Sequence, residues 1–260
     1  MVIDRLSRGA DAIGLVTRRR PGGHLCNDGR ALPLCTATAT VRRRECASAR
    51  QTAHVATDPP FNPIAPFVSF DEVYRGTPPW EIGRPQPALL ELFEAGQVSG
   101  RVLDVGCGTG ELALTAASRG LQATGVDSSV EAIAIARQRA VDRGLAGARF
   151  EVADAMDLSV LDTIFDTVMD SGVFHLFDDA ERARYVESVR CVTAIGGLYH
   201  MLVFSDEAPG HWGPRRIRRI DIETALADGW ELRSVEPAIF EVNIVDGRVR
   251  AWRATAVRSG

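Results

Sequence analysis

The segment Arg101 to Leu114, RVLDVGCGTGELAL, constrains the fold of this chain more than any other stretch. It passes from a short apolar run, typical of a buried strand, through three glycines at alternate positions into a helix-like run. Glycines at such a junction permit a tight turn and let a ligand approach the backbone, and the helix N-terminus that follows carries partial positive charge. The segment therefore predicts a ligand-binding loop at the carboxyl end of a strand.

The spacing of these glycines and the lack of lysine restrict the ligand. Gly106, Gly108 and Gly110 form a G-x-G-x-G pattern, not the G-x-G-x-x-G pattern of dinucleotide-binding loops. All thirty basic residues are Arg, which excludes a P-loop lysine, a Schiff-base lysine and the Tyr/Lys pair of short-chain dehydrogenases. Asp127 ends the next apolar run, where its carboxylate would accept hydrogen bonds from both hydroxyls of a ribose; the alternative is a cap on the following helix.

Strand-like and helix-like runs alternate over most of the chain. We expect helices over 84–97, 111–119, 128–143 and 178–192, and strands over 102–105, 122–126, 148–152, 165–169, 197–204, 230–235 and 249–257. This alternation indicates an α/β fold with a mostly parallel sheet and helices on both faces. The two final strands predict an antiparallel hairpin at one edge of the sheet.

Residues 1–67 differ in composition from the remainder. They hold ten Arg against five acidic residues and show no sustained helical or strand period, so we expect a disordered N-terminal extension. A transit peptide is the alternative, although the acidic residues count against it. We expect residues 68–260 to form one domain and the native chain to start near Val68, where VSFDEVYRGTPPWEIG is typical of a domain start.

Composition also bears on partners and location. The formal net charge is −4 and no apolar run approaches the roughly 20 residues of a membrane span, so we expect no nucleic-acid and no membrane partner. The five cysteines are odd in number and irregular in spacing, which argues against a disulfide framework and a zinc site and for a reducing, cytoplasmic location. We expect no metal, and a monomer or a weak dimer.

Four segments resemble, in order and spacing, the motifs of class I S-adenosylmethionine-dependent methyltransferases. They are VLDVGCGTGELAL, TGVDSS, FEVADAMDL and FDTVMDSGVFHLF. The resemblance covers roughly residues 70–258 and implies a Rossmann-like seven-stranded sheet in the order 3-2-1-4-5-7-6, with strand 7 antiparallel. It also implies that S-adenosylmethionine is the cofactor.

The same resemblance assigns roles to individual residues. The implied cofactor-binding residues are Trp80, Arg84, Asp104, Gly106, Cys107, Gly108, Asp127, Ser128, Asp154, Ala155 and Asp170. Asp104 and the glycines would line the methionine part and Asp127 would hold the ribose. Asp154 and Ala155 would border the adenine, unless Asp154 is a solvated turn residue. Asp170 and Ser171 would lie beside the methyl group and the substrate.

A narrower resemblance lies in FDEVYRGTPPWEIGRPQPALLELF, DSGVFHLFDDAERARY and FSDEAPGHWGPRRI. These segments are similar to the thiopurine-S-methyltransferase-like branch, especially to bacterial enzymes that methylate heterocyclic toxins, hydroxyquinolones and small thiols. The resemblance implies a role in detoxification. Trp80 would form an aromatic wall or a packing staple, and Arg84 would meet the methionine carboxylate or begin a solvated helix.

The expected reaction is in-line displacement of a methyl group onto an S, N or O atom of a small heterocyclic or aromatic molecule. His175 would be a general base with a pKa near neutral, or a packed structural histidine, and Asp170 is the second candidate catalytic residue. We expect His200 in the core, and Trp212 with Arg215 over the substrate or in a solvated loop.

Three other functions are weighed against this reading. Asp58 to Phe61, DPPF, resembles the motif of nucleic-acid base methyltransferases, but no apolar strand leads into it. A nicotinamide-dependent oxidoreductase is disfavoured by the glycine spacing, and a non-catalytic cofactor-binding module remains open.

Overall fold

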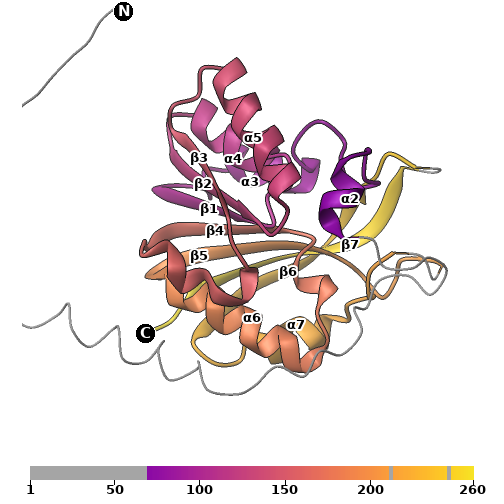
Figure 1. The fold of residues 1–260 in the computed structure, drawn as a ribbon. Coiled ribbons are helices and arrows are strands. Elements are labelled where there is room, and N and C mark those ends of the chain that lie inside the picture. The colour runs from indigo at the N-terminus through magenta and orange to yellow at the C-terminus, as the bar shows by residue number, and fades with distance from the viewer. Residues whose placement is uncertain (1–68, 211–212, 245–246) are drawn as a thin grey trace, which may run out of the picture. The chain divides into compact units, whose positions relative to one another are not determined.

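Seven strands form one sheet in the order β3-β2-β1-β4-β5-β7-β6 (Figure 1). The computed structural model describes residues 69–260 apart from 211–212 and 245–246. The strands are β1 (Arg101–Val105), β2 (Gln122–Asp127), β3 (Ala148–Val152), β4 (Phe165–Ser171), β5 (Thr193–Phe204), β6 (Trp230–Glu241) and β7 (Arg248–Arg258). β1 to β5 run parallel, and β7 pairs antiparallel with both β5 and β6. The expected order and the antiparallel strand are confirmed.

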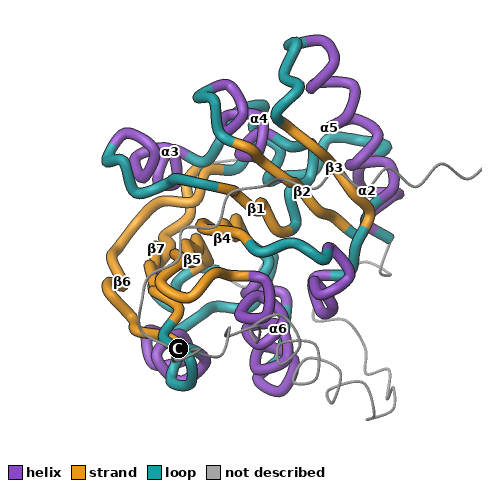
Figure 2. The backbone as a smooth tube through the Cα atoms, turned by 90° about the vertical axis from the view of Figure 1, so that its left-hand side faces the viewer, coloured by secondary structure: helices purple, strands orange, loops and turns teal. Residues whose placement is uncertain are grey.

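Helices cover both faces of this sheet, as expected (Figures 1 and 2). They are α2 (Phe70–Tyr74), α3 (Pro87–Glu94), α4 (Glu111–Ser118), α5 (Val130–Asp142), α6 (Asp179–Val192) and α7 (Arg219–Ala225), with 3-10 turns η2 (Ala155–Leu161) and η3 (Phe174–Leu176). One apolar cluster joins α3, α4 and α5 to the sheet, and another joins α6 and α7 to its opposite face. Because both faces are covered, β1 is buried from Val102 to Val105, as parallel strands usually are.

The strand order reverses between β1 and β4. β2 and β3 lie on one side of β1, whereas β4 and β5 lie on the other. The loops that leave β1 and β4 therefore diverge at their carboxyl ends and open a crevice there, which is where open α/β sheets bind ligands.

Most expected elements are present, and their ends differ for local reasons. Ser129 caps α5 by accepting the Ala132 N–H, and Asp178 forms a capping box with Glu181 at α6. The helix expected over 84–97 spans only Pro87–Glu94, and it cannot begin earlier because Gln86 precedes a proline and has an extended backbone, ψ 127°. α2 and α7 were not expected, since five and seven residues are too few for a clear helical period. The expectations for residues 1–67 lie outside the described residues.

The third glycine of the opening segment serves the packing of helix against sheet. Gly110 lies at φ +90°, and a Cβ there would stand 2.7 Å from the Phe150 ring and 2.9 Å from Ala136 Cβ. Gly120 lies at a similar φ of +84°, with nothing within 4 Å of the same position.

Replacing Gly110 by Ala is therefore expected to lower the free energy of unfolding more than replacing Gly120. Both changes force alanine into the left-handed region at about 1–2 kcal/mol, and Gly110→Ala adds an overpacking cost of about 1–3 kcal/mol. Urea unfolding of the two variants measures the difference. Equal losses of unfolding free energy in the two variants would show that the Phe150 ring does not restrict the side chain at position 110.

Candidate active site

Two adjoining cavities lie at the carboxyl ends of β1, β2 and β4. The larger has a volume of about 360 Å³ and the smaller about 70 Å³. Both are lined by Tyr74, Trp80, Gly106, Ser171 and Phe240. A ligand that spans both cavities would therefore place its centre between these five residues.

The smaller cavity contains the expected methionine end of the site. Asp104, Cys107 and Gly108 line it together with Gly106. Asp104 accepts the Ala113 N–H at 3.1 Å, and burial, with smaller contributions from the charges of Asp127 and Asp170, raises its pKa to about 8. Burial also raises the pKa of the Cys107 thiol well above its usual value, so this cysteine is a neutral wall of the cavity.

The larger cavity begins at Asp127, the last residue of β2. Its two oxygens accept N–H groups from Gly108 at 2.9 Å and from Ser129 at 2.8 Å, so the carboxylate fixes both the glycine loop and the start of α5. Burial raises its pKa, and these backbone hydrogen bonds oppose that rise. Asp127 and Ser128 line the cavity, and each carboxylate oxygen keeps a further lone pair for a ligand.

Asp154 and Ala155 line the same cavity beyond Asp127. The Asp154 side chain accepts the Met156 N–H at 2.9 Å and caps η2. Asp154 is exposed, so this turn residue fits both alternatives that the sequence left open, a border of the adenine and a solvated turn.

A lid segment, residues 69–86, covers the junction of the two cavities. Trp80 Nε1 donates to the Tyr74 hydroxyl at 2.9 Å, and that hydroxyl stands 2.5 Å from where a Cβ on Gly108 would lie. Arg84 lines the smaller cavity, while its guanidinium is paired with Glu241 at 2.5 Å.

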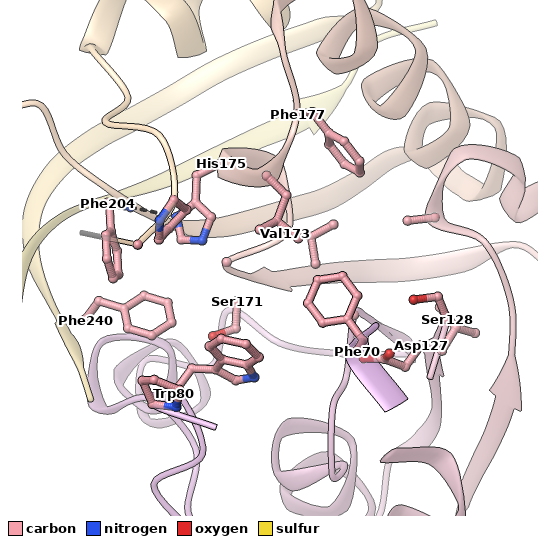
Figure 3. A pocket seen from close by; sticks show the side chains of 18 of the residues that line it. Phe70, Trp80, Asp127, Ser128, Ser171, Val173, His175, Phe177, Phe204 and Phe240 are labelled. Atoms are coloured by element: carbon pink, nitrogen blue, oxygen red, sulfur yellow. Dashed lines mark hydrogen bonds between the residues drawn. The ribbon is translucent and has the colours of Figure 1, made fainter. Parts of the chain in front are cut away.

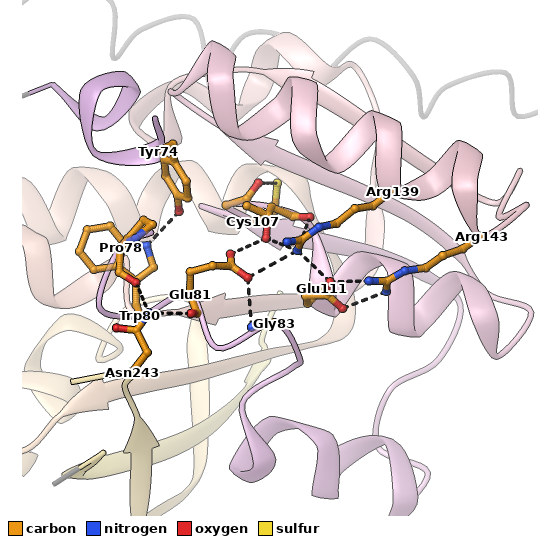
Figure 4. Close-up of polar contacts among 12 residues, drawn as sticks. Tyr74, Pro78, Trp80, Glu81, Gly83, Cys107, Glu111, Arg139, Arg143 and Asn243 are labelled. Atoms are coloured by element: carbon orange, nitrogen blue, oxygen red, sulfur yellow. Dashed lines mark hydrogen bonds and ion pairs between the residues drawn. The ribbon is translucent and has the colours of Figure 1, made fainter. Parts of the chain in front are cut away.

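A polar network fastens this lid to the glycine loop and α5 (Figure 4). Thr109 donates its hydroxyl hydrogen bond to Glu81 of the lid. Arg139 on α5 reaches Thr109, Glu81 and, at 2.8 Å, Glu111. Arg143, one turn later, contacts Glu111 alone among these residues, so of the two arginines Arg139 is the one that reaches the lid. Asp71 of the lid also accepts hydrogen bonds from Ser129 and Glu131 at the start of α5.

The structure corrects the expectation that Asp170 touches cofactor or substrate. Asp170 lines neither cavity and its side chain is buried. Its carboxylate accepts the N–H groups of Val173 and Phe174 and the hydroxyls of Tyr185 and Tyr199, at 2.7 to 3.0 Å. These four donors satisfy it internally, so it shapes the loop after β4, and only the neighbouring Ser171 lines the cavities.

His175 does line the larger cavity, but not in the form of a ready general base. Its Nδ1 accepts the Phe204 N–H at 3.1 Å, which requires the hydrogen of the neutral ring to be on Nε2. Burial, with a smaller effect from the Arg216 charge, lowers its pKa to about 3. The expected pKa near neutral is therefore wrong. His200, as expected, is a core residue bonded to Thr255 and the Gln97 carbonyl.

Aromatic rings enclose the other end of the larger cavity (Figure 3). Phe204 and Phe240 pack edge to face at 5.2 Å, and the His175 ring stands edge-on to Phe204 at 5.0 Å. Gly213 and Pro214 of the loop after β5 complete this wall. Phe240 comes from the last hairpin, and no motif in the sequence pointed to it.

Arg216 holds the loop after β5 by donating to four of its backbone carbonyls, those of Ala208, Pro209, Gly210 and Pro214. Arg215, for which the sequence left a place over the substrate or in a solvated loop, contacts the Phe177 carbonyl and Asp179. The expectation for Trp212 falls outside the described residues, as does that for Asp58 to Phe61.

Comparison with known proteins identifies the family. A methyltransferase-domain family model matches residues 102–197. The 2-heptyl-1-hydroxyquinolin-4(1H)-one methyltransferase of Mycobacteroides abscessus is 36% identical over 184 residues, 67% of this chain and 81% of that protein. The chain belongs to the S-adenosylmethionine-dependent methyltransferases.

Solved structures agree with this assignment. One, from a study of the conversion of a disulfide bond into a thioacetal group during echinomycin biosynthesis, is 37% identical, with a TM-score of 0.67 over 73% of this chain and 91% of that one. The magnesium protoporphyrin IX methyltransferase of Synechocystis, with S-adenosylmethionine bound, shares the fold at 21% identity and a TM-score of 0.53, over 66% and 76% of the two chains.

This methyltransferase uses S-adenosylmethionine as its cofactor and a small molecule as its methyl acceptor. The two cavities fit such a cofactor, because the buried carboxylates of Asp104 and Asp127 line them beside the glycine loop. The described residues include no helix able to cross a membrane and no metal-ligand cluster.

The raised pKa of Asp104 predicts a pH-dependent stability. Between the unfolded value of about 3.9 and the folded value of about 8, the folded chain binds more protons at this group than the unfolded chain. Its contribution to the free energy of unfolding therefore falls as pH rises through that window. Asp104→Asn cannot ionise, so the stability of the variant relative to wild type should increase with pH. Urea unfolding at several pH values tests this, and a constant difference would contradict it.

The lid network predicts unequal effects for two neighbouring arginines. Arg139→Gln should weaken S-adenosylhomocysteine binding about threefold to tenfold, because charged hydrogen bonds between lid and α5 are lost. Arg143→Gln removes a similar charge from the same helix without touching the lid, and should leave binding nearly unchanged. Calorimetric titration compares the two, and equal losses would show a general charge effect.

Proposed function

We propose that this methyltransferase methylates an acidic hydroxyl or thiol of a small, flat heteroaromatic molecule. The observation that carries the proposal is the aromatic enclosure of the acceptor end by Phe204, Phe240 and His175, with Trp80 at the junction of the two cavities. Stacked and edge-on rings favour planar acceptors over flexible aliphatic ones. The hydroxyquinolone acceptor in the name of the Mycobacteroides abscessus relative belongs to this class.

The acceptor would arrive already ionised. Asp170 is saturated by four donors, and Nδ1 of His175 is occupied by the Phe204 N–H. No other His and no Lys line the described part of the larger cavity. An acidic hydroxyl or thiol needs no base, because it is largely deprotonated near neutral pH.

The chain's own residues would then bind and orient the two reactants. Asp104, with Gly106, Cys107 and Gly108, would hold the methionine part, whose ammonium would favour the ionised form of Asp104. Asp127 and Ser128 would hold the ribose, and Asp154 with Ala155 the adenine. When bound, the cofactor supplies an electrophilic methyl group, which the junction between Trp80 and Ser171 would direct toward the aromatic end for in-line attack.

Several wider features belong to the same proposal. The acceptor is a small molecule, and neither a nucleic acid nor a membrane is a partner. Residues 68–260 are the catalytic unit. The protein is a cytoplasmic monomer or weak dimer, and its role is the detoxification of heterocycles. Arg84 forms an ion pair with Glu241. Arg84 would therefore contact the methionine carboxylate only if this pair shifts.

A methyl-transfer screen tests the acceptor class. With labelled S-adenosylmethionine, we expect hydroxyquinolones, nitrophenols and aromatic thiols to be methylated, and aliphatic alcohols, amines and catechols requiring a metal to be poor acceptors. Phe240→Ala should raise KM for the planar acceptors about tenfold or more, because a ring that packs on them is lost. Turnover confined to aliphatic amines would overturn the proposal.

A further inference from the structure

The ring of His175 has one nitrogen committed and one available. Nδ1 accepts the Phe204 N–H. Among the described residues, no second hydrogen bond to the His175 ring is found. Nε2 is not among the enclosed polar atoms that lack a partner. Because the residue lines the larger cavity, Nε2 faces that cavity beside Gly172, 3.1 Å from where a Cβ on Gly172 would lie (Figure 3).

The surroundings hold the ring in this orientation. Phe204 stands edge-on to it and Phe240 lies tilted against it at 6.2 Å. Arg216, from the loop after β5, is the charged group whose field opposes a second proton on the ring. On the strands beneath, Asp170 and Tyr199 hydrogen-bond to each other. The ring is thus a fixed, neutral donor and not an exchangeable base.

We propose that His175 donates a hydrogen bond from Nε2 to the anionic oxygen or sulfur of the acceptor, and thereby selects the ionised acceptor and aims its lone pair. This inference rests on the proposed function, because it requires an acidic acceptor. His175 is a positioning donor that touches the reacting atom and keeps its own proton throughout.

Electrons and protons balance without a base. The acceptor's lone pair forms the new bond to the methyl carbon, and the electron pair of the broken carbon–sulfur bond returns to sulfur. The acceptor changes from an anion to a neutral ether or thioether, and the sulfonium becomes a neutral sulfide. The proton that the acceptor lost in solution takes no part in the step.

Two variants separate the donor from the structural hydrogen bond. Asparagine places its amide near the position of Nδ1, so His175→Asn can still accept the Phe204 N–H but cannot reach the acceptor. Glutamine extends to about the position of Nε2, so His175→Gln keeps a donor in the cavity. If His175 is purely structural, His175→Asn should behave more like wild type than His175→Gln. If His175 is the proposed donor, His175→Gln should behave more like wild type.

The first measurement is the ionisation of a bound chromophore. A nitrophenol is titrated by absorbance in the complex with S-adenosylhomocysteine. In wild type and His175→Gln the pKa of the bound phenol is expected to be about one unit below its solution value, a tenfold change in ionisation. In His175→Asn it should return toward the solution value. An unchanged bound pKa in His175→Asn would overturn the inference.

The second measurement distinguishes a donor from a general base. For a donor, the midpoint of kcat/KM against pH moves with the solution pKa of the acceptor across a series of nitrophenols. For a base, the midpoint stays at one pH for every acceptor, and this outcome would also overturn the inference. If wild type neither binds nor methylates nitrophenols, hydroxyquinolones or aromatic thiols, the proposed function itself fails. Methylation that proceeds independently of the side chain at 175 contradicts the inference alone.

Discussion

Three buried carboxylates at the carboxyl ends of neighbouring strands are the constraint on which the site depends. Asp104, Asp127 and Asp170 each accept backbone N–H groups from the turn or helix that follows. These bonds hold the glycine loop, the start of α5 and the loop after β4 in place. Burial opposes the ionised form of Asp104 and Asp127. Because these two carboxylates also line the cavities, they favour cationic or hydroxyl-bearing ligands.

The two halves of the site differ in chemistry. Carboxylates and backbone dominate where the cofactor would lie, whereas Phe204, Phe240 and His175 form the acceptor end. Trp80 and Ser171 border both regions. This division separates recognition of a polar, charged reactant from recognition of a flat, apolar one, and it places the reacting atoms at the boundary.

Local periods and spacings predicted the α/β sheet and a ligand-binding loop after its first strand, whereas the strand order and the cofactor came from the resemblance to class I methyltransferases. The sequence could not predict that Asp170 would be saturated by Tyr185 and Tyr199, since those hydroxyls come from α6 and β5. The lowered pKa of His175 likewise results from burial and from the charge of Arg216, and its tautomer depends on a bond to Phe204, 29 residues away in sequence. Phe240 reaches the site only through the final hairpin. Tertiary contacts of this kind produce no periodic pattern in the sequence, so they could not be predicted from it.

The lid is held by the end of the chain. Gln86 pairs with the backbone of Glu241, and Asn243 binds the carbonyls of Pro78 and Glu81. These partners are separated by 155 or more residues. While the protein is being synthesised, the glycine loop, α5 and the first five strands therefore emerge from the ribosome before the last hairpin. At that stage the lid can already contact Thr109 and Arg139, but its hydrogen bonds to Glu241 and Asn243 form only after the last hairpin is released.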